Sequence, residues 1–187
     1  MNAILKQLSP SATDMIRADH TRVMAAFHRY KVDSDPAIRR AIVGTICLSL
    51  EVHAQLEEEI FYPAMREANI VILDKLVPEH EEMRRLMTML RSFEPTDMQY
   101  DQTLMELMRQ VMHHVADEET ILLPAAENAL GPRLGELGAQ MTRRRLELTA
   151  SRAGELARYK ARTMQPATMI AAAGAVVAGL YLLRGRR

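Results

Sequence analysis

Apolar residues recur along this chain at intervals of three and four positions, which is the period of one face of an α-helix. Such a stripe runs from Val43 to Ile60, and the same spacing returns from Leu104 to Ile121. Glycine and proline fall mostly between the long apolar stretches, where they end helices. The pattern predicts helices joined by short turns, and therefore an all-α protein.

We expect five helices, over residues 13–31, 36–66, 70–93, 97–130 and 133–165. Ser11 or Thr13 is the expected first N-cap, Asp35 and Pro36 fit a second helix start, and Pro78 should kink the third helix or restart it. Short connections make successive helices antiparallel. The expected fold is an up-down-up-down four-helix bundle with an additional C-terminal helix and an apolar tail. In domain terms, we expect the bundle over 1–130, a charged fifth helix or linker over 131–165, and the tail over 166–187.

The two halves of the predicted bundle repeat each other. A shift of 61 positions carries the second helix onto the fourth, and a shift of 60 carries the first onto the third. Each half then has one histidine on its first helix and a His-x-x-x-Glu on its second. The six residues in these equivalent positions are His20, His53, Glu57, His80, His114 and Glu118.

These six residues lie on apolar stripes that should face the bundle interior. Residues four apart share one face of a helix, so each His-x-x-x-Glu presents an imidazole beside a carboxylate. Two buried carboxylates without partners would be costly, and a pair of divalent cations removes that cost. Four imidazoles can terminate two metals and two glutamates can bridge them, which leaves room for a bridging oxo or hydroxo group and about one open position per ion. We expect two iron ions, although residue type alone also permits manganese or zinc.

Simpler interpretations apply to the neighbouring residues. A single histidine on an apolar face is usually a hydrogen-bonded core residue, but four in equivalent slots argue for ligation. His28 and His113 lie off the repeated stripes, and we interpret them as ordinary polar residues. Glu58 and Glu119 also repeat, and they are either acceptors for imidazole N–H groups or solvated side chains.

Composition narrows the function classes. The chain has 24 basic and 24 acidic residues, so it lacks the excess positive charge of a nucleic-acid-binding protein. Cys47 is the only cysteine, which excludes an internal disulfide and a cysteine-rich metal site. No secretory signal is recognisable at the N-terminus, so we expect the metal domain in the cytoplasm.

Residues 167–183 form an uncharged, mostly apolar stretch with basic residues on both sides. At about 1.5 Å per residue it falls slightly short of the ~30 Å hydrocarbon core of a membrane. We expect a single C-terminal membrane span, with a weakly ordered tail or an oligomerisation helix as the alternatives. Ala171, Ala175 and Gly179 form a small-xxx-small ladder that would let two copies pack as a homodimer.

The duplicated motifs resemble the hemerythrin-like family, often called HHE cation-binding domains. The resemblance covers about residues 11–130 and is carried by HAQLEEEIFYP from His53 and HVADEETILLP from His114. It implies a four-helix bundle with a non-heme di-iron centre at the six residues named above. Oxygen-carrying hemerythrins have a further histidine where this chain has Arg84, and an aspartate in the slot of Glu119. The chain therefore looks more like the variants with two bridging glutamates, which the family uses for sensing oxygen, nitric oxide or iron, or for iron delivery in stress repair.

Three functions follow from these expectations. The first is a di-iron module that binds or senses a small diatomic ligand, O2 or NO, or handles iron under stress. The second is an enzyme at the same centre, either an oxidase or peroxidase or an iron donor in repair. The third is a metal-free helical interaction protein anchored to a membrane. Sequence favours a binding role over an enzyme without deciding between them.

Overall fold

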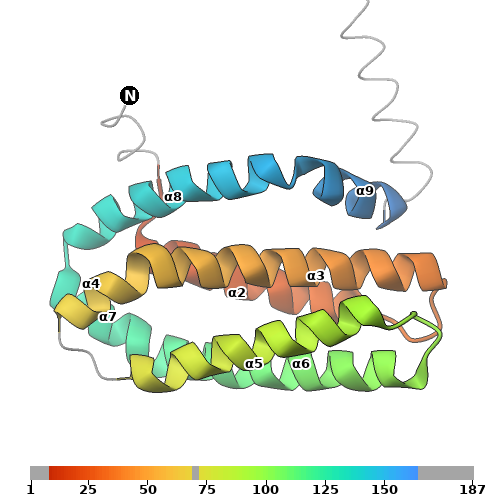
Figure 1. The fold of residues 1–187 in the computed structure, drawn as a ribbon. Helices are drawn as coiled ribbons and strands as arrows, with labels where there is room; N and C mark the ends of the chain where they lie inside the picture. The colour runs from red at the N-terminus through yellow and green to blue at the C-terminus, as the bar shows by residue number, and fades with distance from the viewer. Residues whose placement is uncertain (1–8, 69–71, 164–187) are drawn as a thin grey trace, which may run out of the picture.

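The computed structural model describes residues 9–68 and 72–163, and these residues form helices and short connections (Figure 1). The all-α prediction is confirmed. In chain order the helices are α2 (Ala12–Arg29), α3 (Pro36–Leu56), the turn η1 (Glu57–Phe61), α4 (Tyr62–Glu67), α5 (Leu73–Ser92), α6 (Met98–Asp117), the turn η2 (Glu118–Leu122), α7 (Leu123–Leu130), α8 (Arg133–Ser151) and α9 (Ala153–Thr163).

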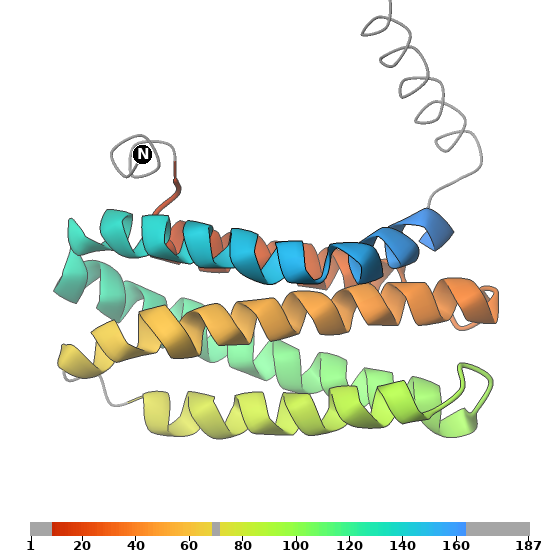
Figure 2. The ribbon, with the colours of Figure 1, turned by 45° about the horizontal axis from the view of Figure 1, so that its top comes forward.

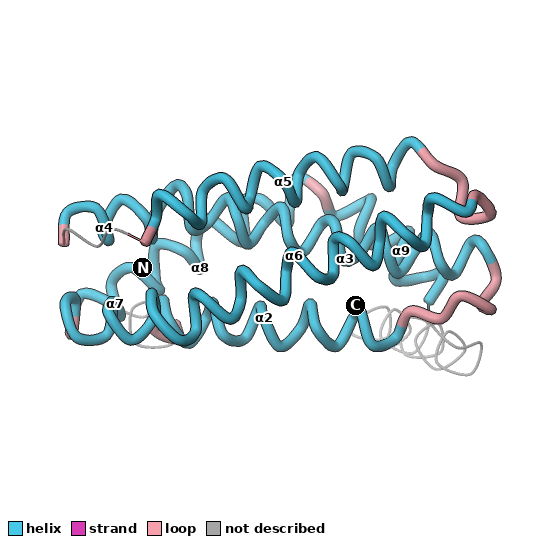
Figure 3. The backbone as a smooth tube through the Cα atoms, turned by 90° about the horizontal axis from the view of Figure 1, so that it is seen from below, coloured by secondary structure: helices cyan, strands magenta, loops and turns pink. Residues whose placement is uncertain are grey.

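The long helices lie side by side as a bundle. α2 packs against α3, and α5 packs against α6. The helices α3 and α6 continue through η1 and η2 into α4 and α7, which lie together at one end of the bundle (Figure 3). α8 and α9 run along one outer side, over α2 and α3, and α5 and α6 lie on the opposite side (Figures 1 and 2).

The helix ends follow local signals in the sequence. The Ser11 side chain accepts a hydrogen bond from the backbone N–H of Asp14, and the Asp35 side chain accepts one from the N–H of Ala37. Gly131 has a φ of 43° and ends α7 in a conformation that favours glycine. Pro78 lies inside α5, so the third predicted helix continues past it.

The two π-helical turns, η1 and η2, were not predicted. Each begins at the glutamate of a His-x-x-x-Glu motif, and the backbone oxygens of Glu57 and Glu118 accept from the N–H groups five residues later. A proline follows directly on each of these donors, at Pro63 and Pro124. Proline cannot donate and crowds the carbonyl four residues earlier, so it favours the wider turn. The repeated proline was the signal in the sequence.

The fifth helix is not continuous, and that prediction is wrong. It breaks at Arg152, whose φ of −110° and ψ of 11° depart from helical values, into α8 and α9. The break allows both segments to follow the bundle. Gly138 brings α8 against the backbone that leads into α2, because a Cβ there would clash with the Pro10 carbonyl oxygen. Gly44 on α3 similarly leaves room for the Tyr159 ring of α9.

Two apolar clusters fill the interior and lie on either side of a polar layer. One is centred on the α4 and α7 end and includes Phe61 and Leu122. The other lies toward the α5–α6 connection and includes Leu50 and Val111. Within residues 9–68 and 72–163, no helix is both long and apolar enough to cross a membrane. The predicted C-terminal span lies outside the described residues and stays a prediction.

Candidate metal centre

All six residues singled out by the repeat point into the polar layer between the two apolar clusters. Their exposed fractions lie between 0% for Glu57 and Glu118 and 6% for His53. His20 comes from α2, His53 from α3, His80 from α5 and His114 from α6, and the two glutamates begin η1 and η2. Four helices therefore each supply one imidazole. The two glutamates reach the centre from the π-helical turns.

The ligand atoms form two groups that share one carboxylate. His20, His53, Glu57 and Glu118 have atoms that lie within 4.8 Å of one another, and so do Glu57, His80 and His114. Glu57 is the common member. A carboxylate shared by two groups of imidazoles could contact a metal ion in each group.

Each glutamate lies between imidazoles from the two halves. Glu57 Oε2 is 3.3 Å from His53 Nε2 and 3.4 Å from His80 Nε2. Glu118 Oε2 is 3.0 Å from His20 Nε2 and 3.5 Å from His114 Nε2. All four rings present Nε2 to the centre. These contacts between imidazoles and carboxylates of different halves hold the two repeats in register.

The opposite ring nitrogens meet a second set of carboxylates. Nδ1 of His20, His80 and His114 lies 2.8–2.9 Å from Glu119, Glu58 and Glu79 respectively. Nδ1 of His53 lies 3.7 Å from Asp19. A carboxylate at Nδ1 holds the proton there and leaves Nε2 as a free lone pair for a metal.

The outer carboxylates settle one open question and reveal a missed feature. Glu58 and Glu119 are acceptors for imidazole groups, and not merely solvated side chains. Asp19 and Glu79 were overlooked, although each directly precedes a candidate ligand and the two are repeat mates, 60 residues apart. An acidic residue before both His20 and His80 was the available signal.

Two features of the centre fit a bound cation. Glu57 Oε1 is buried and has no hydrogen-bond partner. His80 Nε2 and His114 Nε2 lie 3.0 Å apart, and with both Nδ1 protons held by carboxylates their lone pairs face each other. Facing lone pairs repel unless a proton or a metal lies beside them. The donor set of imidazoles and carboxylates suits iron, manganese or zinc.

Comparison with known proteins identifies the family of this chain. The family model for the hemerythrin HHE cation-binding domain matches residues 11–164. The chain belongs to this family. A solved HHE cation-binding domain-containing protein from Mycobacterium kansasii superposes with a TM-score of 0.68 at 19% identity, over 82% of this chain and 99% of that one. A protein from Nostoc sp. described as a DNA nickase is 32% identical over 121 residues, which are 63% of this chain and 34% of that protein. The aligned region thus spans about a third of that relative.

Within this HHE domain, burial and neighbouring charges shift the pKa values of the converging groups. Burial and the nearby Glu118 carboxylate hold the pKa of Glu57 well above its usual range. Burial opposes charging of His20, but the hydrogen bonds that its ring donates to Glu118 and Glu119, together with the charges of the nearby carboxylates, outweigh burial and raise the pKa of His20 to about 9. Burial lowers the pKa of His53 to about 4. Metal ions that bind at these residues compete with protons for the same atoms.

Two further side chains support the centre of the HHE domain. The Tyr62 hydroxyl donates to Glu118 Oε1 at 3.0 Å, and the repeat mate of Tyr62 is the apolar Leu123. Arg84 donates to both carboxylate oxygens of Glu58, at 2.7 and 2.6 Å. As noted in the sequence analysis, Arg84 occupies the position at which oxygen-carrying hemerythrins have a further histidine. It positions an outer carboxylate here and is not among the groups that converge as ligands.

Proposed function

We propose that the six converging side chains bind two iron ions and that the chain is a di-iron sensor or binding protein for a small ligand such as O2 or NO. The observation that carries this proposal is Glu57, whose carboxylate belongs to both groups of ligand atoms. When bound, such a pair of ions supplies redox chemistry and open positions for a small ligand. The protein supplies the orientation of every ring.

The outer carboxylates support this role by fixing the rings before metal binds. Three of the four Nδ1 atoms have a carboxylate at hydrogen-bond distance, so the corresponding Nε2 atoms are already aimed inward. Ligand rings that are held in place lose little freedom on binding, and that favours tight metal binding.

A path from the centre to the exterior supports a sensing role. His53 Nδ1 faces Asp19, and Asp19 accepts hydrogen bonds from Arg145 on α8, one of them 2.7 Å long. Nη1 of Arg22 also donates a hydrogen bond to Asp19, at 2.8 Å. A change in ligation at His53 would therefore reach α8 through a single side chain. The helices α8 and α9 are the elements that would pass such a change onward.

The experiment is to measure the iron content of the full-length protein after loading, for the wild type and for two matched variants. His114→Ala removes a ligand and should lower iron from about two per chain to one or fewer. His113→Ala removes the exposed neighbouring ring and should leave iron unchanged. Normal iron in His114→Ala, or no iron in the wild type, would contradict the proposal.

The sensing part is tested separately on the loaded protein. Addition of NO or O2 should change its visible absorption spectrum stoichiometrically, and the spectrum should then remain stable. Continuous consumption of O2 or peroxide would instead indicate an enzyme.

A further inference from the structure

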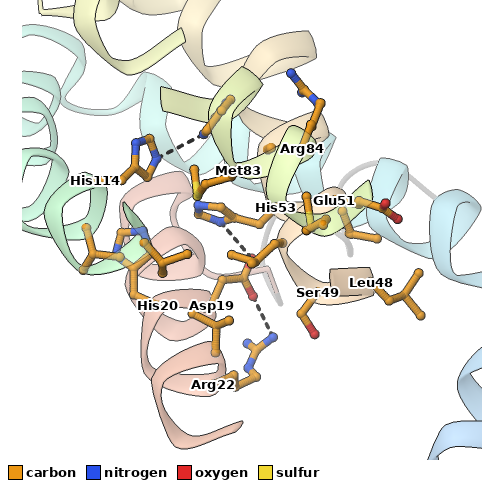
Figure 4. Close-up of a pocket in the computed structure, with 18 of the residues that line it drawn as sticks. Asp19, His20, Arg22, Leu48, Ser49, Glu51, His53, Met83, Arg84 and His114 are labelled. Atoms are coloured by element: carbon orange, nitrogen blue, oxygen red, sulfur yellow. Dashed lines mark hydrogen bonds and ion pairs between the residues drawn. The ribbon is translucent and has the colours of Figure 1, made fainter. Parts of the chain in front are cut away.

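A cavity adjoins the centre on its imidazole side. Its volume is about 190 Å³, and all four imidazoles line it (Figure 4). Beyond them, one apolar residue from each of the four helices lies three positions from that helix's histidine. These four residues are Val23, Leu50, Met83 and Val111. The cavity therefore continues from the candidate metal site into an apolar layer.

The opposite side of the centre is closed. Tyr62, Phe61 and Leu122 are 0% exposed and belong to the apolar cluster at the α4 and α7 end. A molecule that approaches the two ions from within the protein must therefore come from the side of the four-residue apolar layer.

The cavity is much larger than a diatomic ligand requires. A water-sized molecule needs only about 10–15 Å³ of such a space. Further apolar side chains extend the lining away from the imidazoles, with Met87, Leu48 and Leu156 among them. Cavities of this kind, mostly apolar with a few polar groups, are typical of organic ligand sites.

Charged groups lie at the outer part of the cavity. Arg22, Arg84 and Arg145 line it against Asp19 and Glu51, and both Arg22 and Ser49 are exposed residues at which it reaches the surface. Figure 4 shows the ring of His20 on one side of the cavity and Leu48 and Ser49 on the other. Arg22 and Arg145 both pair with the single carboxylate of Asp19, which leaves this part of the lining with an excess positive charge.

Arg145 has a hydrogen-bond donor without an acceptor. Two nitrogens of Arg145 donate to Asp19, but its Nε is buried and has no hydrogen-bond partner. A buried N–H without an acceptor costs free energy that an added acceptor would recover. A carboxylate is a strong acceptor for a guanidinium group.

We propose that this cavity binds a small organic acid with an apolar chain, with its chain along Val23, Leu50, Met83 and Val111 and its carboxylate at Arg145. The ligand would lie beside the proposed metal pair, and in this respect the proposal rests on the proposed function. It assigns the candidate di-iron centre an organic ligand in addition to any diatomic one.

The test uses the full-length protein, with and without iron, and octanoate as the probe. Calorimetric titration should show one octanoate bound per chain. Octan-1-ol, which keeps the chain but lacks the charge, should bind at least tenfold more weakly, and octylamine more weakly still. In the iron-loaded protein, octanoate should also shift the visible spectrum, because its chain lies against the ligand rings. Equal binding of octanoate and octylamine would overturn the proposal.

Two variants locate the site. Val111→Phe fills the apolar layer and should abolish octanoate binding, whereas Met112→Phe adds the same ring at the next, exposed position and should leave binding unchanged. Arg145→Lys keeps the charge but removes the Nε–H, and it should weaken octanoate at least tenfold without affecting octan-1-ol. Unchanged octanoate binding in Val111→Phe would show that the acid binds elsewhere and would overturn the proposal.

The two proposals fail in different ways. A protein that loads with iron but does not bind octanoate overturns the organic-acid site alone. A protein that binds octanoate as described but takes up no iron supports the cavity site and contradicts the di-iron function.

Discussion

The two halves of the bundle, α2 to α4 and α5 to α7, carry the same centre with different surroundings. The four histidines and two inner glutamates match between halves, and so do the outer carboxylates, Asp19 with Glu79 and Glu58 with Glu119. Each half lends an outer carboxylate to the other, because Glu119 faces His20 and Glu58 faces His80. Neither half could build this centre alone.

The halves differ because α8 and α9 pack mainly against the first one. Glu79 reaches His114 at 2.9 Å, whereas the shorter Asp19 lies 3.7 Å from His53 and is instead held by Arg145 of α8. Tyr62 in the first half corresponds to Leu123 in the second. The repeat thus supplies the candidate metal ligands, and the added helices modify one half of it.

The largest expected effect is at the carboxylate that joins the halves. Glu57→Gln should lower bound iron from about two per chain to less than one, because Glu57 belongs to both ligand groups. Glu118→Gln should retain the ion held at Glu57, His80 and His114. Metal analysis after loading and desalting provides the measurement.

A folding control separates ligation from stability in this variant. Burial and the Glu118 carboxylate raise the pKa of Glu57 well above its usual range, which favours its neutral form, and glutamine is the isostere of that form. The thermal midpoint of metal-free Glu57→Gln should therefore match that of the metal-free wild type. Two irons retained in Glu57→Gln would refute a shared bridging role.

The next effect compares the two repeat mates outside the ligand set. Glu79→Gln should weaken metal affinity about 10- to 100-fold, since its hydrogen bond to His114 is short. Asp19→Asn should weaken metal affinity less but lower the stability of the protein more, because it leaves Arg145 without its carboxylate. Competitive titration with a chelator and denaturant unfolding of both variants measure the two effects. A greater loss of metal affinity in Asp19→Asn than in Glu79→Gln would contradict this expectation, because it would make the longer Asp19–His53 contact the more important one.

Much of the candidate centre could be predicted because helical geometry turns sequence spacing into spatial position. An offset of four residues places His53 beside Glu57 on one face, and a repeat of 60 or 61 residues indicates where the equivalent groups lie. The helix starts at Ser11 and Asp35 were also readable, because caps act over three or four residues.

The features that were missed depend on contacts between distant segments. Nothing local shows that Glu119 reaches His20, or that Arg145 reaches Asp19, across 99 and 126 positions. The break at Arg152 follows from the packing of α9 on α3, which spacing along α8 does not reveal. The cavity likewise arises from four helices together.

A smaller effect tests whether α8 is bound tightly to the first half. Gly138→Ala would place a Cβ against the backbone at Pro10, and we expect a loss of about 1–3 kcal/mol in the free energy of unfolding. Gly135→Ala on the same helix meets nothing within 4 Å and should be neutral or stabilise by up to about 1 kcal/mol. Chemical denaturation of the two metal-free variants distinguishes them. Equal stabilities would mean that α8 can move away from α2 without cost.

The smallest effect concerns the phenol that the second half lacks. Tyr62→Phe removes the donor to Glu118 and should lower the stability of the metal-free protein by about 1 kcal/mol. Burial and the Glu57 and Glu118 carboxylates raise the pKa of Tyr62 well above its usual range, so the hydroxyl stays protonated in the folded protein. Because the pKa of Tyr62 is higher in the folded than in the unfolded protein, its contribution to the free energy of unfolding is fully present below the unfolded pKa of about 10. The difference between the two proteins should therefore be constant between about pH 6 and about pH 9, and a difference that disappears within that range would show that the hydroxyl is not the donor to Glu118.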